Sequence, residues 1–246
     1  MKAHYMKHEM VIYTAMNATM RTIKEKMKYI AMNGRQETHL CGFLIHRRDG
    51  TMKAAYAFWK GYKPAFFEIP DSPFCTPQLP YLIENFPYID EKKCNLFDGK
   101  KFYIFFQEEE SMLNFQRQME AIQPQSPEFH KIFGLTLGFP PNAVDFYVKK
   151  ITAKEDERLQ LKRQQIGLRF CGISCAANIN DLIEDALWLW DRYPYPEAIR
   201  EGLSIRVHNE RVSVPYKNFT RLRYIHMQIL ERTHSINSLK NASLTP

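Results

Sequence analysis

The chain has 246 residues, of which 45% are hydrophobic and 25% charged, with a formal net charge of +7. This composition is typical of a globular protein rather than a disordered chain, and no run approaches the roughly 18 apolar residues of a membrane span. Five cysteines, an odd number in a chain too long to need disulfides, favour a reducing compartment. We therefore expect a cytoplasmic protein.

The positive charge is concentrated at the two ends. Residues 1–34 carry six Lys or Arg against two acids, residues 200–246 carry eight against three, and the middle is slightly acidic. Clustered like charge attracts an acidic partner, although two solvated helix faces would give the same distribution.

Residues 8–33 are predicted to form an amphipathic helix that ends at Asn33-Gly34. Its apolar stripe consists of Ile12, Met16, Met20, Ile23, Met27 and Ile30. Methionine adapts to irregular surfaces, so Met16, Met20 and Met27 are candidates for a partner-facing surface, and core packing is the alternative.

Short β-type runs follow at 38–46, 54–60 and 64–69, and Asp49-Gly50 is a hairpin turn signal between the first two. The run at 101–107 is apolar on both faces and predicts a central strand. Five prolines between residues 70 and 90 predict a long ordered loop with a short helix at 79–85.

The sequence from residue 111 to about residue 202 is predicted to be mainly helical. Helices are expected at 111–122, 127–137, 141–150, 154–170 and from Asn178 or Asn180 to Trp190, followed by a short one from Pro196 to Gly202. Ser126 is a predicted N-cap, with Pro127 at the first helical position. We expect no strand between 110 and 200, which disfavours a parallel, doubly wound sheet.

Alternating apolar and polar residues at 203–216 predict a hairpin with one apolar and one basic face. A last helix is expected at 217–233, and the polar tail from Ser235 is expected to be mobile. The fold class is therefore α+β, with a small, mainly antiparallel sheet region, a large helical part, and a C-terminal hairpin and helix. Possible domains are 1–110 and 111–234, or one continuous domain, before a tail at 235–246.

Common catalytic and nucleotide-binding motifs are missing from the sequence, and we expect no cofactor and no metal. Cys171 and Cys175 would share a face of a helix and could supply two metal ligands, but the small residues around them favour a tightly packed helix crossing. Glu108, Glu109 and Glu110 lie between a buried strand and a helix, where they fit either a catalytic or metal-binding carboxylate site or compensation of the helix dipole.

The C-terminal segment carries the clearest positive signal. Its basic residues are Arg206, His208, Arg211, Lys217, Arg221 and Arg223. Aromatic residues alternate with them at Tyr216, Phe219 and Tyr224, although these side chains could instead belong to the core. Basic groups neutralise phosphates and rings stack on unpaired bases, and the same surface could also bind an acidic protein.

The segment FHKIFGLTLGFPPNAVDFY at 129–147 resembles part of a family of uncharacterised bacterial proteins, of the form His-x-Ile-Gly-Leu-x-Leu-Gly-Tyr-Pro. The matching positions are His130, Ile132, Gly134, Leu135, Leu137, Gly138, Phe139, Pro140, Val144 and Phe146. Phe133 is an extra residue, and Pro141-Asn142-Ala143 replaces a more acidic turn. The resemblance carries no activity over. The two prolines predict a corner between two helices here rather than a binding loop.

Three functional hypotheses follow. The first is a non-enzymatic regulatory protein, of mobile-element or phage type, that binds another protein through the methionine-rich helix or the basic C-terminal face. The second is a DNA- or RNA-binding protein that uses residues 206–224. The third is an enzyme of unfamiliar type, with Glu108–Glu110, His39, Cys41 or His130 in a cleft.

Overall fold

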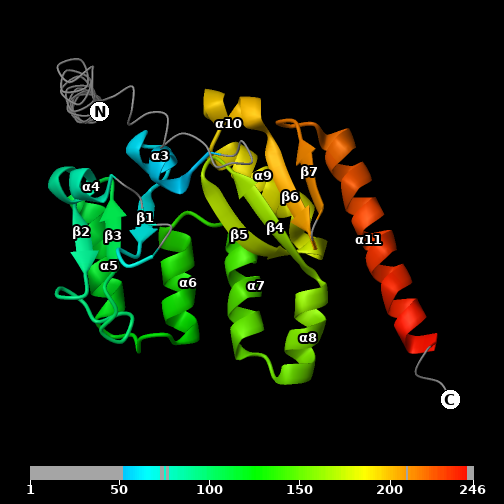
Figure 1. Ribbon diagram of the computed structural model, residues 1–246, viewed down its shortest axis with the longest axis horizontal. Helices are drawn as coiled ribbons and strands as arrows, with labels where there is room; N and C mark the ends of the chain where they lie inside the picture. Colours follow the sequence, from blue (N-terminus) through cyan, green and yellow to red (C-terminus); the bar gives the residue numbers. More distant parts are fainter. Residues whose placement is uncertain (1–51, 73–74, 76–77, 209, 243–246) are drawn as a thin grey trace, which may run out of the picture. The chain divides into compact units, whose positions relative to one another are not determined.

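The computed structural model describes residues 52–72, 75, 78–208 and 210–242, and for residues 233–242 the backbone alone. These residues belong to one compact unit spanning 46–246, and the division considered near residue 110 falls within it. The elements form an α+β fold, as predicted (Figure 1). The predictions for Met16, Met20 and Met27, and those for the strand and turn at 38–50, lie outside the described residues.

The first sheet contains three antiparallel strands in the order β1-β3-β2. Its elements are α3 (Ala54–Trp59), β1 (Ala65–Glu68), α4 (Leu79–Asn85), β2 (Tyr88–Asp90) and β3 (Tyr103–Phe106). Ile104, Phe105 and Phe106 are all buried in the middle strand, which confirms the predicted central strand. The helix expected at 79–85 is also present, with Pro80 in its first turn, where a missing N–H costs nothing.

The strand predicted at 54–60 is wrong, because these residues form helix α3. Alternating alanines and aromatic residues imitate a strand, yet alanine has the highest helix propensity of all residues. The small side chain of Ala57 in α3 also allows the chain at Gly172 to approach closely, since a Cβ added to Gly172 would lie 2.5 Å from the Cβ of Ala57. Packing and propensity together therefore favour the helix.

The structure confirms the helices predicted at 111–122, 127–137 and 141–150. The helices here are α5 (Glu109–Met119), α6 (Pro127–Thr136), α7 (Pro141–Thr152) and α8 (Glu155–Arg163). Ser126 caps α6 as expected, because its Oγ accepts the Phe129 N–H at 3.1 Å. The corner predicted between α6 and α7 is present, and a Cβ on Gly134 would lie 2.9 Å from Val144, so glycine allows these two helices to approach closely.

Replacing Ser126 with alanine is expected to lower the free energy of unfolding by about 1 kcal/mol, because one N–H of the first turn of α6 loses its acceptor. Urea unfolding followed by circular dichroism measures this. Ser126→Thr is the matched control, since it keeps a hydroxyl at the cap. Equal stabilities of the alanine and threonine variants would contradict a capping role.

The helix predicted through residue 170 is wrong beyond Arg163, and the helix crossing expected around Cys171 and Cys175 is a β-hairpin. Strands β4 (Gln165–Phe170) and β5 (Ile173–Asn178) pair antiparallel there. The turn between them is Cys171-Gly172, with φ of 49° and 71°. Two positive φ values define the tight turn that suits the twist of a hairpin, and cysteine is an unusual residue at the first position. The expectation of no strand between 110 and 200 is therefore also wrong.

The second sheet contains four antiparallel strands in the order β5-β4-β6-β7. Its second hairpin, β6 (Leu203–Val207) and β7 (Glu210–Val214), confirms the prediction, and β6 pairs with β4. The chain between β5 and β6 forms η1 (Ile179–Asp181), α9 (Leu182–Arg192) and α10 (Pro196–Glu201), and α11 (Phe219–Ala242) follows β7.

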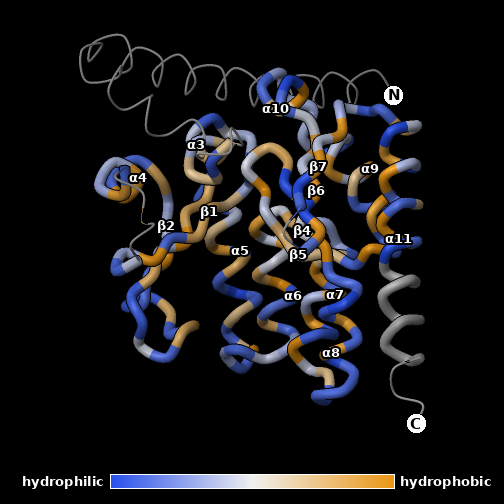
Figure 2. Tube along the Cα trace, turned by 45° about the vertical axis from the view of Figure 1, so that its right-hand side comes forward, coloured by the Kyte–Doolittle hydropathy of each residue, from blue (hydrophilic) through white to orange (hydrophobic). Residues whose placement is uncertain are grey.

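One face of the second sheet is apolar and packs on helices. Leu168, Ile205 and Val214 on this face are fully buried. Helix α9 lies behind the sheet in Figure 1, packing against β5 and α11. Hydrophobic and hydrophilic residues alternate along the N-terminal part of α11, which is the part that Figure 2 colours, as expected for a helix with one buried side. The opposite face of the sheet is polar.

Helix α11 continues to Ala242, beyond the predicted end at residue 233 and through the tail expected to be mobile from Ser235. No glycine or proline occurs in this stretch before Pro246, so the sequence contains no residue that would end the helix.

Candidate functional site

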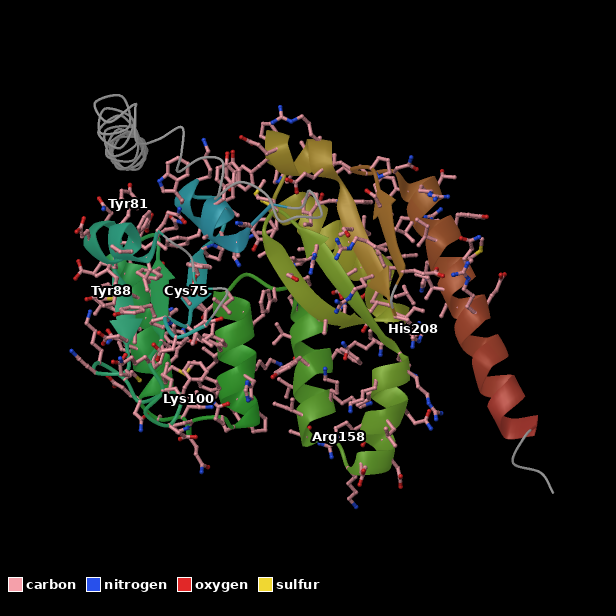
Figure 3. The ribbon with its side chains drawn as sticks, in the orientation of Figure 1. Cys75, Tyr81, Tyr88, Lys100, Arg158 and His208 are labelled. Carbon is pink, nitrogen blue, oxygen red and sulfur yellow. The ribbon has the colours of Figure 1, made fainter. Side chains whose placement is uncertain are left out.

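Two of the predicted basic residues meet on the second sheet. Arg206 and Arg211 are register partners in β6 and β7, so their side chains lie beside each other on the polar face. His208, which is labelled in Figure 3, lies in the turn that joins these strands at one end of the sheet, and its φ is 51°. The hairpin therefore places two guanidinium groups side by side.

The other predicted basic residues lie at or on α11. The Nζ of Lys217 lies 3.0 Å from Oδ1 of Asp191, and the hydrogen bond to this carboxylate raises the pKa of Lys217. The guanidinium of Arg221 lies over the ring of Tyr224, 5.6 Å from its centroid, and Arg223 is exposed.

Helix α11 lies on the side of the sheet opposite to Arg211. Glu210, which alternates with Arg211 along β7, accepts a hydrogen bond from Arg232 of α11 at 2.7 Å. The structure therefore does not join the arginines of α11 to those of the hairpin on one face.

The polar face of the second sheet, here called the arginine face, gathers residues from all four strands. Its members are Gln165, Gly167 and Arg169 of β4, Ser174, Ala176 and Asn178 of β5, Ser204 and Arg206 of β6, and Arg211 and Ser213 of β7. The register aligns Ser174, Arg169, Ser204 and Ser213 in one row and Ala176, Gly167, Arg206 and Arg211 in the next. These residues include three guanidinium groups and no carboxylate, so the face favours anions.

A small cavity of about 40 Å³, here called the anion cavity, opens between Arg169 and Arg206. Its floor includes Gly167, and a Cβ there would lie 3.4 Å from Nε of Arg206, so the arginine side chain lies across the glycine. Ser204 also lines the cavity, is only 8% exposed, and has an Oγ without a hydrogen-bond partner. A buried hydroxyl without a partner is costly, and an anion in the cavity would accept a hydrogen bond from it.

Arg206 is not neutralised within the described part of the chain, where no acidic residue forms an ion pair with it. Its guanidinium therefore keeps its five donors for a ligand. A planar fork of donors matches the oxygen atoms of a phosphate or a carboxylate with two parallel hydrogen bonds.

Sequence reasoning missed Arg169 and Ser204. The helix expected at 154–170 includes Arg169. The alternation of Ile166, Leu168 and Phe170 with Gln165, Gly167 and Arg169 is nevertheless the signal of a strand. The position of Ser204 depends on the pairing of β4 with β6, which no local pattern reveals.

Cys171 and Cys175 lie in the β4–β5 turn and in β5, not on one face of a helix. Burial raises the pKa of the Cys171 thiol to about 12 and also raises that of Cys175, so both thiols are protonated and weakly nucleophilic. Within the described ranges, no group of three or more His, Cys, Asp or Glu side chains could hold a metal ion.

The carboxylates considered for catalysis do not meet His130. Glu108 precedes α5, and Glu109 and Glu110 lie in its exposed first turn, where negative charge complements the helix dipole. His130 lies on α6 and lines a different cavity of about 420 Å³. His39 and Cys41 lie outside the described residues.

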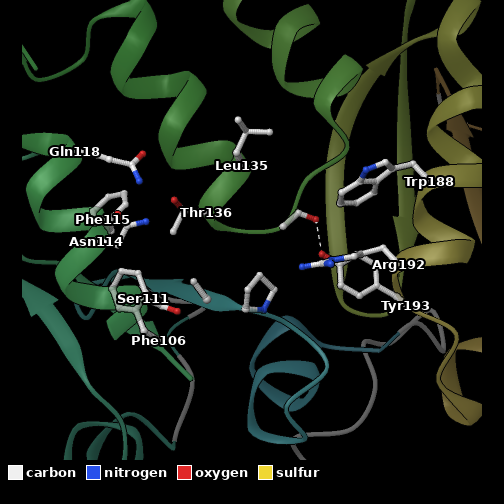
Figure 4. A pocket seen from close by; sticks show the side chains of 13 residues that line it. Phe106, Ser111, Asn114, Phe115, Gln118, Leu135, Thr136, Trp188, Arg192 and Tyr193 are labelled. Carbon is white, nitrogen blue, oxygen red and sulfur yellow. Dashed lines mark hydrogen bonds between the residues drawn. The ribbon is translucent and has the colours of Figure 1, made fainter. Parts of the chain in front are cut away.

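A separate groove of about 320 Å³ lies between α5 and α9. Figure 4 shows Ser111, Asn114 and Gln118 of α5 facing Trp188 and Arg192 of α9 across it. It shares no lining residue with the anion cavity.

None of the described helices is both long and apolar enough to cross a membrane. The chain was also compared with known proteins. No family model, no curated protein and no solved structure matches it significantly.

Proposed function

We propose that this protein binds nucleic acid through the arginine face, without catalysing a reaction. The observation that carries the proposal is the anion cavity, in which Arg206, unpaired with any described acid, lies beside the buried and unpartnered hydroxyl of Ser204. Both groups donate hydrogen bonds to an anion, and Arg169 adds a second positive charge at the cavity wall.

A phosphate fits this donor set better than a carboxylate does. A guanidinium satisfies two oxygen atoms, and Ser204 of the cavity lining adds a hydroxyl donor for a third, which suits the larger number of phosphate oxygens. Gln165 and Ser213 add neutral donors along the same face, where several successive phosphates would lie. An extended row of donors favours a polymer over a single phosphate.

A second candidate function is binding of an acidic protein, which the sequence suggested first. The observation in its favour is on α11, where Phe219, Tyr224 and Met227 are 44%, 47% and 56% exposed near Arg221 and Arg223. Exposed apolar residues beside basic ones are typical of protein-binding surfaces. The two functions use different faces of the molecule and can be tested separately.

The proposal is tested with short fluorescently labelled DNA and RNA strands, by measuring anisotropy at several salt concentrations. Arg206→Gln is expected to weaken binding about tenfold, because one charge-assisted contact is lost. The slope of log affinity against log salt should also fall by about one. Arg158→Gln is the matched control, since Arg158 is an exposed arginine of α8 (Figure 3) outside the arginine face, and it should bind like the wild type.

Equal losses in the Arg206 and Arg158 variants would show that only net charge matters, which contradicts a site on the arginine face. Binding of an acidic polypeptide that is abolished by Arg221→Gln and Arg223→Gln, in a protein that binds no oligonucleotide, would instead support the second candidate.

A further inference from the structure

The cavity lined by His130, here called the aromatic pocket, has walls made mainly of rings. Phe97, Phe133, Phe139 and Tyr147 line it together with His130. The rings of His130 and Tyr147 meet edge to face, with centroids 5.5 Å apart, and those of Phe97 and Phe133 are 5.7 Å apart. The volume of about 420 Å³ is within the range of small-molecule sites, so one planar ring can enter it.

Most of this wall comes from the glycine- and proline-containing corner between α6 and α7. Tyr147 in this wall is 39% exposed, and Gly134, which also lines the pocket, allows the two helices to approach closely. The segment predicted to be only a corner is thus also the wall of a cavity.

Polar groups at the pocket connect it to the arginine face. The Nζ of Lys150 lies 5.4 Å from the centroid of Tyr147 and donates a hydrogen bond to Oε1 of Gln165 at 2.9 Å. Gln165 belongs to the arginine face. Burial lowers the pKa of both Lys150 and His130, so His130 is mainly neutral near pH 7 and suited to stack on an uncharged ring.

The aromatic pocket also borders the anion cavity directly. Ser174 and Cys175 of the edge strand β5 line both spaces. An anion beside Arg206 and a ring beside Tyr147 would therefore lie on either side of one strand. A nucleotide unit in a single strand carries both a phosphate and a planar base, so one unit offers a group to each of the two spaces.

We infer that the aromatic pocket receives one unstacked base of a single strand whose phosphate occupies the anion cavity. This inference rests on the proposed function and specifies its substrate class. A base that is paired and stacked in a duplex cannot enter the pocket, so the protein discriminates single strands from duplexes. The surrounding rings stack on any base, so the discrimination needs no particular sequence.

The test compares the binding of one labelled strand with that of its duplex, for the wild type and two variants. Tyr147→Leu keeps an apolar side chain but removes the ring, and it is expected to weaken single-strand binding about tenfold while duplex binding stays unchanged. Tyr224→Leu is the matched control, because Tyr224 is similarly exposed on α11, and it should leave both affinities unchanged. A strand without bases should bind about as weakly to the wild type as the intact strand binds to Tyr147→Leu.

Circular dichroism verifies that each variant is folded. Tyr147→Phe, which restores a ring, should recover single-strand binding, which a general structural defect would not predict. Equal binding of strand, duplex and baseless strand, with sensitivity to Arg206→Gln retained, would overturn the base pocket and leave the proposed function intact. Failure of the wild type to bind any of them would overturn both.

Discussion

Replacing Gly138 with alanine is expected to lower the free energy of unfolding by about 3 kcal/mol, because the new methyl group meets both backbone strain and a packed neighbour. Gly138 has φ of 80°, which alanine rarely adopts. A Cβ there would lie 2.3 Å from the hydroxyl oxygen of Tyr193 and 3.0 Å from Pro64. The same hydroxyl donates a buried hydrogen bond to the Gly138 carbonyl at 2.8 Å, drawn in Figure 4.

Gly99→Ala is the matched control for this prediction. Gly99 has nearly the same φ, 76°, but nothing lies within 4 Å of its added Cβ, so only the backbone strain of about 1 kcal/mol should remain. Urea unfolding of both variants measures the difference. If the two variants lose the same stability, the contact between the α6–α7 corner and Tyr193 does not contribute as proposed.

The stability of the protein is expected to fall between about pH 4 and pH 7 because of Asp185. This carboxyl group is 1% exposed and its Oδ2 has no hydrogen-bond partner, although the Ala143 N–H stabilises the charged form. Burial, and then the nearby charges of Asp181 and Glu184, raise its pKa to about 7. The folded state therefore holds a proton that the unfolded state releases near pH 4.

The direction of this pH dependence follows from the coupling between proton binding and folding. Stability decreases with pH wherever the folded state binds more protons than the unfolded state, and one proton corresponds to about 1.4 kcal/mol per pH unit. Asp185→Asn, which imitates the protonated acid, should raise the free energy of unfolding by about 4 kcal/mol at pH 8 and change it little at pH 4. Urea unfolding at both pH values measures this. A variant that is less stable than the wild type at pH 8 would show that the carboxylate forms a favourable interaction there.

The fold class could be predicted because several elements are determined by local pattern. The apolar run of β3, the cap at Ser126 and the alternation of β6 and β7 all appear in the structure as expected. The errors arose where local signals conflict. The acidic first turn of α8 indicates a helix start, so the predicted helix was extended into residues that form β4. In α3, the alternation of alanines with aromatic residues resembles the pattern of a strand.

The candidate site was only partly predictable. Arg206 and Arg211 are close in sequence, so a hairpin was enough to pair them. Arg169 joins them only through the pairing of β4 with β6, and Ser204 becomes a buried donor only within that sheet. The aromatic pocket depends on a similarly long-range arrangement, since Phe97 from the first sheet region lines the same cavity as Tyr147 of α7. Local sequence patterns do not reveal which distant residues come together, so these arrangements could not be predicted from the sequence.

Photo-cross-linking of a thiolated single strand to the protein, followed by mass-spectrometric mapping, tests the central claim most directly. We expect cross-links in peptides from residues 129–150, 165–178 and 203–214, which contain the aromatic pocket and the arginine face, and we expect an excess of unlabelled strand to suppress them. Cross-links confined to the exposed side of α11, or none that an unlabelled strand suppresses, would contradict binding at the arginine face.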